Sequence, residues 1–242
     1  MKRFAPLAFA LAAVATDAAA LDLQREYALS IAGIDIGDAT LTLRQDGDRY
    51  SAIIDGDYRF LFWSGAAKVE SLGKVEDGAF SPLAYNSRLV SSTREVTTAI
   101  AFANGGVADA SFQSEPPFDP ERFADRIPVE QEHLRGALDP VSAFLIPATS
   151  AKSACAGLLR IFSGIVRFDL QLKPEGQGED AGNCSGAYRP VSGHRRKSDE
   201  VDRLRDDGLA LRLFEIAPGL WAPERIGFRT MFGTLALTRK DG

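Results

Sequence analysis

The residues of this chain that could do chemistry are few, and they form no recognisable catalytic set. It has two histidines, His133 and His194, and two cysteines, Cys155 and Cys184. No serine lies in a G-x-S-x-G elbow, and Ser142 lies within an apolar segment. Catalysis by His194 would need a nucleophile and a carboxylate that the sequence does not indicate. We therefore expect no enzymatic activity, and a hydrolase that uses His194 is the less favoured alternative.

Positive charge is most concentrated in the run His194-Arg195-Arg196-Lys197. Adjacent arginines offer bidentate donors, so this run could bind a phosphate or an anionic head group. The simpler interpretation is the solvated end of a strand, because Asp199, Glu200 and Asp202 follow and balance the charge. We retain His194, Arg195 and Arg196 as candidates for ligand binding.

Neither a metal nor a cofactor is expected. Zinc would need two further ligands beside the two thiolates, and the histidines do not complete a recognisable set with them. Asp46-Gly47-Asp48 lacks the spaced carboxylates and terminal glutamate of a calcium loop. Gly105-Gly106 is typical of a hairpin rather than of a phosphate-binding loop.

The N-terminal residues predict export. Two basic residues precede an apolar run from Phe4 to Ala15, and an A-x-A pattern of small residues ends at Ala20. The run is too short to span a bilayer, and no later stretch is long enough to do so. We expect a signal peptide over residues 1–20 and one periplasmic domain over residues 21–242, without a transmembrane segment.

We expect N-terminal sequencing of the protein recovered from the periplasm to begin at Leu21, because small residues occupy positions 18 and 20. A chain that retains Met1 there would contradict both the cleavage site and the predicted localisation.

Charge and cysteine content are consistent with export. The chain has a formal net charge of −5, and removal of residues 1–20 takes away a net +1 and leaves −6. This acidic balance argues against a nucleic-acid partner. In an oxidising compartment two cysteines normally pair, so we expect a Cys155–Cys184 disulfide, with two separate buried thiols as the alternative.

The elements that must position these residues are mainly strands. From residue 22 onward apolar residues mostly recur every two positions, as in Tyr27, Leu29 and Ile31. Asp77-Gly78 and Asn104-Gly105 are typical of tight hairpin turns. The pattern predicts about ten to twelve antiparallel strands. The expected fold class is mainly β: a large antiparallel curved sheet or open spiral β-barrel, with one or two short plugging helices.

Other segments interrupt the alternation. The apolar stretch Tyr58–Trp63 predicts a short helix or a buried turn. Asp139–Ile146 begins with an N-cap aspartate followed by proline and predicts a short helix buried in the mouth or interior of the sheet. We expect loops at 174–183 and 197–208. The proline-rich stretch 115–120 favours a crossover within one domain over a domain boundary.

A curved sheet with one apolar face encloses either a filled core, which is the simpler interpretation, or an apolar groove for a ligand. Five aromatic residues could line such a groove: Phe60, Phe62, Trp63, Phe112 and Phe144. We expect the first three to lie near its opening, where an acyl chain or a similar apolar ligand would enter.

Several short motifs occur in a fixed order over nearly all of the mature chain. They are Gly56–Ser64, Glu70–Gly73, Asp77-Gly78, Pro82–Tyr85, Leu138–Ala143, Phe162–Gly164, Arg167–Leu170, Cys184, Tyr188–Arg195, Pro223–Ile226 and Phe232–Leu235. In this order they resemble the proteobacterial exported family called domain of unknown function 3108. The resemblance implies an envelope protein of Gram-negative bacteria. It also implies an architecture similar to the open barrels of periplasmic lipoprotein carriers, although no cysteine follows the cleavage site to carry a lipid anchor.

These observations lead to the hypothesis of an exported, non-enzymatic protein that supports the cell envelope by binding a lipid, an acylated ligand or another apolar partner. The alternative is a structural or protein-interaction module, in which the core is filled and an exposed sheet edge meets an envelope protein.

Overall fold

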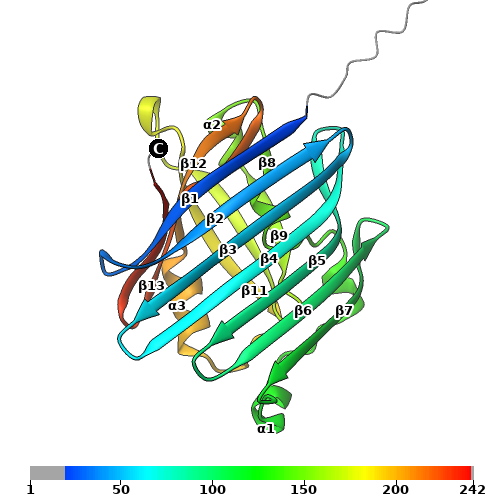
Figure 1. The fold of residues 1–242 in the computed structure, drawn as a ribbon, viewed down its shortest axis with the longest axis vertical. Coiled ribbons are helices and arrows are strands. Elements are labelled where there is room, and N and C mark those ends of the chain that lie inside the picture. The colour runs from blue at the N-terminus through cyan, green and yellow to red at the C-terminus, as the bar shows by residue number, and fades with distance from the viewer. Residues whose placement is uncertain (1–19, 241–242) are drawn as a thin grey trace, which may run out of the picture.

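The structure, a computed structural model, describes residues 20–240, so nearly all of the predicted signal peptide lies outside the described residues. One antiparallel sheet of fourteen strands dominates it, with the strand order β7-β6-β5-β4-β3-β2-β1-β14-β13-β12-β11-β10-β9 and β8 paired to β13 (Figure 1). The sheet curves around an interior, but β7 and β9 remain its two ends and do not pair with each other. The predicted fold class is confirmed, with more strands than the sequence pattern indicated.

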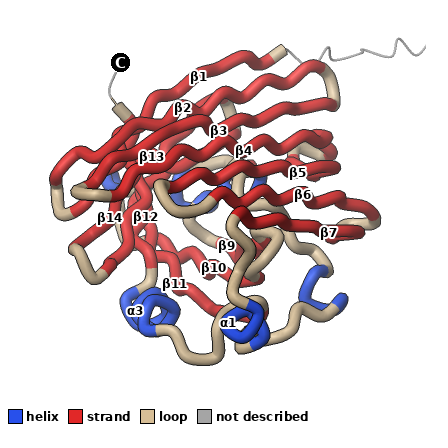
Figure 2. The backbone as a smooth tube through the Cα atoms, turned by 60° about the horizontal axis from the view of Figure 1, so that its bottom comes forward, coloured by secondary structure: helices blue, strands red, loops and turns tan. Residues whose placement is uncertain are grey.

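The strands are β1 (Leu21–Ile31), β2 (Ile34–Asp46), β3 (Arg49–Phe60), β4 (Trp63–Glu76), β5 (Ala79–Ser91), β6 (Glu95–Ala103), β7 (Gly106–Glu115), β8 (Ile146–Pro147), β9 (Gly157–Phe162), β10 (Arg167–Pro174), β11 (Asn183–Ser192), β12 (Leu209–Ala217), β13 (Leu220–Thr230) and β14 (Gly233–Arg239). The helices are α1 (Pro120–Ala124), α2 (Ala151–Ala154) and α3 (Asp199–Asp207), with the 3-10 helices η1 (Gln131–Leu134), η2 (Ser142–Phe144) and η3 (Gly178–Asp180). Figure 2 shows α1 and α3 at the same end of the molecule.

Tight turns set the register of the long hairpins. Asp77 and Gly78, between β4 and β5, have φ angles of 51° and 79°. Asn104 and Gly105, between β6 and β7, have φ angles of 54° and 73°. Positive φ at both central residues is the geometry that matches the twist of antiparallel strands, and it favours Asp-Gly and Asn-Gly.

The chain fills the interior of the curved sheet with its own plug segment, residues 131–147. Val141 and Leu145, which flank η2, join Leu43, Tyr50 and Phe162 in the larger buried core. The predicted buried helix at 139–146 is therefore present as the single 3-10 turn η2. Its apolar side chains find partners there because the inner faces of the strands are also apolar.

The prediction of a helix or buried turn at Tyr58–Trp63 is wrong. Phe60 and Trp63 are directly paired across β3 and β4, and Leu61 and Phe62 form the hairpin turn between them. Phe62 is 92% exposed, so this turn is at the surface. Periodicity could not identify the turn, because a short apolar run is compatible with a helix, a strand or a turn.

The prediction of a loop over 197–208 is also wrong, because α3 occupies most of it. Ser198 caps this helix, its Oγ accepting the N–H of Val201 at 3.4 Å. The helix packs against β11 and β13. Charged residues dominate its sequence. Val201 and Leu204 are its two partly buried apolar residues, and two such residues give only a weak apolar pattern.

The predicted disulfide is confirmed. Cys155, directly after α2, is joined to Cys184 in β11, with 5.5 Å between the two Cα atoms. Both residues lie in a second buried core cluster with Leu170, Leu172 and Leu211. The disulfide therefore ties the chain just after α2, downstream of the plug segment, to strand β11 of the sheet.

Candidate functional site

The predicted site residues lie in three separate places. Phe60, Phe62 and Trp63 are at the tip of the β3–β4 hairpin. Phe144 lies in the plug segment. Phe112, His194, Arg195 and Arg196 lie around the gap between the end strand β7 and the β9–β10 turn. Phe112 lines a cavity large enough for a sizeable ligand, and His194 and Arg195 lie next to two of its other lining residues, Gly193 and Arg126.

That cavity, the seam cleft, has a volume of about 560 Å³. It lies between β7, the segment 123–134 and the β9–β10 turn. Its apolar walls are formed by Val107, Phe112, Phe123, Ile127, Leu134 and Phe162. Ligand pockets are typically about 300–1,000 Å³ and mostly apolar. The seam cleft has this size, and its lining also includes the polar side chains of Asp109, Arg126 and Gln131.

Aromatic contacts hold one wall of the seam cleft in place. Phe112 of β7 packs against Phe118 and Phe123, with ring centroids 6.0 Å and 5.1 Å away. The guanidinium of Arg126 lies 5.1 Å from the centre of the Phe123 ring. Phe112, Phe123 and Arg126 line one end of the cleft, where α1 follows β7 along the chain.

Arg126 gives this end of the cleft a positive charge. Its Nη1 donates to the carbonyl oxygen of Gly193 at 2.5 Å, and its buried Nε has no hydrogen-bond partner. Arg126 and Arg195 form a backbone bridge, and no ion pair of either guanidinium is seen among the described side chains. Burial, and then the charge of Arg195, lower the pKa of Arg126, yet an arginine stays charged. An anion at this end of the cleft would stabilise the charged guanidinium and so oppose the effects of burial and of Arg195 on its pKa.

His194 supports the wall of the seam cleft. It is buried, and its Nε2 lies 3.1 Å from the hydroxyl of Tyr188. Its carbonyl oxygen accepts the N–H of Ile127 at 2.8 Å, which ties the cleft wall to the end of β11. Burial lowers the pKa of His194, which favours the neutral imidazole. The side chains of Arg195 and Arg196 are exposed beside it.

Comparison with known protein families matches residues 26–238 to the family described as "Protein of unknown function (DUF3108)". The chain belongs to this family. The resemblance carried by its ordered motifs is thereby confirmed, and two of those motifs, Leu138–Ala143 and Tyr188–Arg195, lie in the plug segment and beside the seam cleft. No curated protein and no solved structure matches the chain.

The plug segment of this DUF3108 protein is fixed by a buried polar cluster that the sequence did not predict. Asp139 Oδ1 accepts the N–H groups of Val141 and Ser142 at 2.8 and 2.9 Å. Its Oδ2 lies 2.6 Å from Ser142 Oγ and 2.9 Å from Ser71 Oγ. The Tyr50 hydroxyl completes the cluster, 2.7 Å from Ser142 Oγ.

This cluster has a structural role, because Asp139, Ser71 and Ser142 are each no more than 1% exposed. Burial raises the pKa of Asp139, while the hydrogen bonds partly oppose that shift. The N-cap motif identified Asp139, but Ser71 is 68 residues away in sequence and belongs to β4. No local pattern could have joined the two.

Phe144 of this DUF3108 protein lines a second, smaller cavity of about 70 Å³. Its other walls are apolar side chains of the sheet, including Leu41, Ile54 and Leu237. A cavity of about 150 Å³ holds benzene, so this one is too small for an acyl chain in the present arrangement.

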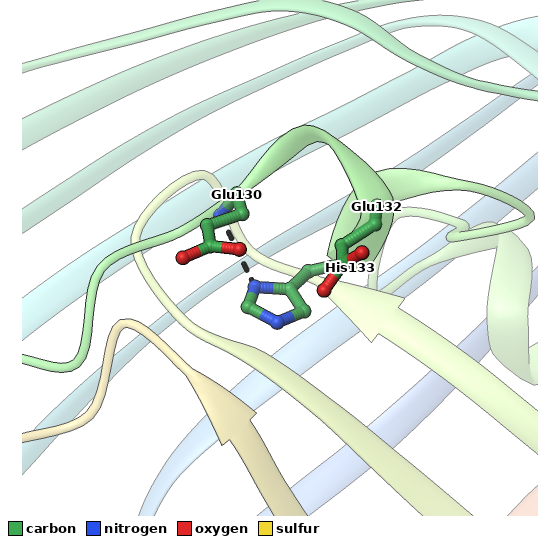
Figure 3. Close-up of side chains that lie close together, drawn as sticks. All are labelled: Glu130, Glu132 and His133. Atoms are coloured by element: carbon green, nitrogen blue, oxygen red, sulfur yellow. Dashed lines mark hydrogen bonds between the residues drawn. The ribbon is translucent and has the colours of Figure 1, made fainter.

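Glu130, Glu132 and His133 form the one group of described residues whose side chains are close enough together to hold a metal ion (Figure 3). His133 Nδ1 accepts the backbone N–H of Glu130 at 3.1 Å, which closes the first turn of η1. Both glutamates are exposed. A helix-start turn accounts for this arrangement without a metal.

Among the described residues, no helix combines the length and the apolar character needed to cross a membrane.

Proposed function

We propose that this DUF3108 protein is an exported, non-enzymatic periplasmic protein that supports the cell envelope by binding a lipid-like amphiphile with an anionic head group. The observation that carries the proposal is the seam cleft, whose apolar walls lead to Arg126 and its unpartnered Nε. The apolar chain of the ligand would lie against the apolar walls of the cleft. Its anionic group would accept hydrogen bonds from Arg126, with Arg195 close by.

The energetics suit such a ligand. Burying about ten methylene groups contributes roughly 8 kcal/mol before the costs of ordering the ligand. A hydrogen bond between a guanidinium and an anionic group contributes about 1.5–3 kcal/mol more in a partly buried site. After the costs of association and ordering are subtracted, these terms correspond to micromolar binding or weaker.

The proposed location has two supports. The N-terminal residues have the pattern of a signal peptide, and the Cys155–Cys184 disulfide is typical of an oxidising compartment. The absence of a catalytic role is part of the proposal, since the imidazole of His194 is buried against Tyr188 and its backbone holds the cleft wall.

We expect laurate to bind saturably in calorimetric titrations of delipidated protein, and Arg126→Ala to weaken laurate binding about tenfold or more. Binding of dodecanol, which has no charge, should be unchanged by Arg126→Ala, whereas Phe112→Ala should weaken both ligands. Arg44→Ala is the matched control, because this exposed arginine pairs with Asp22 on another part of the sheet.

Two results would contradict amphiphile binding in the seam cleft. One is the absence of saturable laurate binding. The other is an equal loss of laurate and dodecanol binding in Arg126→Ala, which would indicate a damaged wall rather than a lost charge contact.

The second candidate function is a protein-interaction module, which the free end strand β7 favours. Its position at the end of the sheet leaves one side without a neighbouring strand (Figure 1). A partner strand could extend the sheet there. Strand addition would use the backbone of β7, whereas amphiphile binding would use the charge contact of Arg126. The two functions are therefore separable, because Arg126→Ala should weaken laurate binding and leave the pairing of a partner strand unchanged.

A further inference from the structure

Large apolar side chains are exposed mainly at three hairpin tips. Eleven such side chains are exposed among the described residues, and six of them lie at the β1–β2, β3–β4 and β13–β14 turns. These six form the tip patch: Ile34 (63% exposed), Leu61 (67%), Phe62 (92%), Trp63 (45%), Met231 (73%) and Phe232 (47%).

The three tips contact one another, so the tip patch is a single surface. The backbone N–H of Ala32, in the β1–β2 turn, donates to the carbonyl oxygen of Thr234, at the start of β14, at 2.9 Å. Phe232 lies 6.1 Å from Phe60 and 5.7 Å from Trp63 between ring centroids. Figure 1 shows the three turns together at the lower left of the molecule.

The charges beside the tip patch are mostly positive. Arg59 and Arg229 lie within two residues of the tips, and Asp35 is the one acidic residue at that distance. Both arginines are exposed, and no ion pair of either is seen among the described side chains. A surface that joins apolar tips to unpaired arginines is complementary to an anionic lipid interface, where side chains insert and guanidinium groups meet phosphates.

We propose that the tip patch docks this protein onto the surface of a bilayer that contains anionic phospholipid. Phe62, Leu61 and Met231 insert below the head groups, and Trp63 lies at the interface, where its ring has apolar contacts and its N–H remains solvated. Arg59 and Arg229 contact the lipid phosphates. This proposal does not depend on a ligand in the seam cleft, because the two sites share no residue.

Co-sedimentation with vesicles tests the tip patch. Vesicles of phosphatidylcholine with phosphatidylglycerol should bind the protein, and vesicles of phosphatidylcholine alone should bind it more weakly. Phe62→Ser with Met231→Ser should lower the partition coefficient about tenfold or more. The matched control is Leu83→Ser with Leu158→Ser, which removes two exposed leucines outside the patch and should leave binding unchanged.

Two further readouts identify the contact. Tryptophan emission should shift to shorter wavelength with anionic vesicles, and Trp63→Phe should abolish that shift although Trp221 remains. Arg59→Ala with Arg229→Ala should remove the preference for anionic vesicles.

The proposal is overturned if wild-type protein binds neither kind of vesicle, or if the tip and control variants bind equally. It is also overturned if the tip variant instead abolishes a dimer seen by sedimentation, since the patch would then join two copies of the chain.

Discussion

Replacement of Asp139 with alanine is expected to lower the free energy of unfolding by about 3–5 kcal/mol. The carboxylate accepts two backbone N–H groups and contacts two hydroxyls inside the sheet, at distances between 2.6 and 2.9 Å. Its loss leaves those buried donors without partners and opens a void. Urea unfolding followed by circular dichroism measures the change.

Asp48→Ala is the control for this loss, because Asp48 pairs with Lys74 at the surface across 3.7 Å. Exposed ion pairs contribute little to stability, so Asp48→Ala should change the free energy of unfolding by less than about 1 kcal/mol. Equal destabilisation by the two substitutions would show that the Asp139 cluster does not fix the plug segment.

The pH dependence of stability gives an independent test of Asp139. Burial raises its pKa in the folded protein, so the folded state binds this proton more tightly than the unfolded state does. The stability that this tighter proton binding contributes is complete at pH values below about 4, the pKa of an aspartate in the unfolded chain. It is lost as the pH rises through the pKa of Asp139 in the folded protein. Asp139→Asn cannot titrate, so the stability of wild type relative to this variant should increase as the pH falls. A difference that is constant with pH would contradict the raised pKa.

Removal of the disulfide is the other change with a large expected effect. Cys155→Ala with Cys184→Ala should lower the free energy of unfolding by about 3–4 kcal/mol, because a closed loop spanning 29 residues constrains the unfolded chain. Urea unfolding with and without a reductant measures this loss. The reductant should destabilise wild type by a similar amount and leave the double variant unaffected. Equal stability of wild type and the double variant would contradict this role.

The strands were predictable because their apolar residues alternate along the chain, and Asp77-Gly78 and Asn104-Gly105 fixed two turns. The plug was predictable from Asp139 and Pro140, which start a short apolar segment with nowhere to lie except inside. The hairpin at Phe60–Trp63 was not, because Leu61 takes a φ of 53° in a turn without glycine. Turn chemistry normally relies on glycine or asparagine at such positions.

The candidate site was less predictable than the fold. Phe112 and the run at His194 were both identified, but they are about eighty residues apart and meet only because the sheet curves. Arg126 was missed altogether. It follows a proline-rich stretch with no local pattern, and its importance comes from a bridge to Arg195 and a contact with Gly193.

The order of the strands in the sheet differs from their order along the chain, because the first strand and the last strand are neighbours in the middle of the sheet. Read from β9 to β14 and on from β1 to β7, the sheet is a simple meander in which each long strand follows its neighbour. Along the chain, β1 to β7 come first, the segment 116–156 then leads across to β9, and β9 to β14 return to the middle of the sheet, where β14 pairs with β1. β1 consequently remains an edge until the last strand has emerged and paired, through Tyr27 to Ile31, with β14. The pairing of β1 with β14 is therefore the contact that joins the strands before the plug segment to those after it in one continuous sheet.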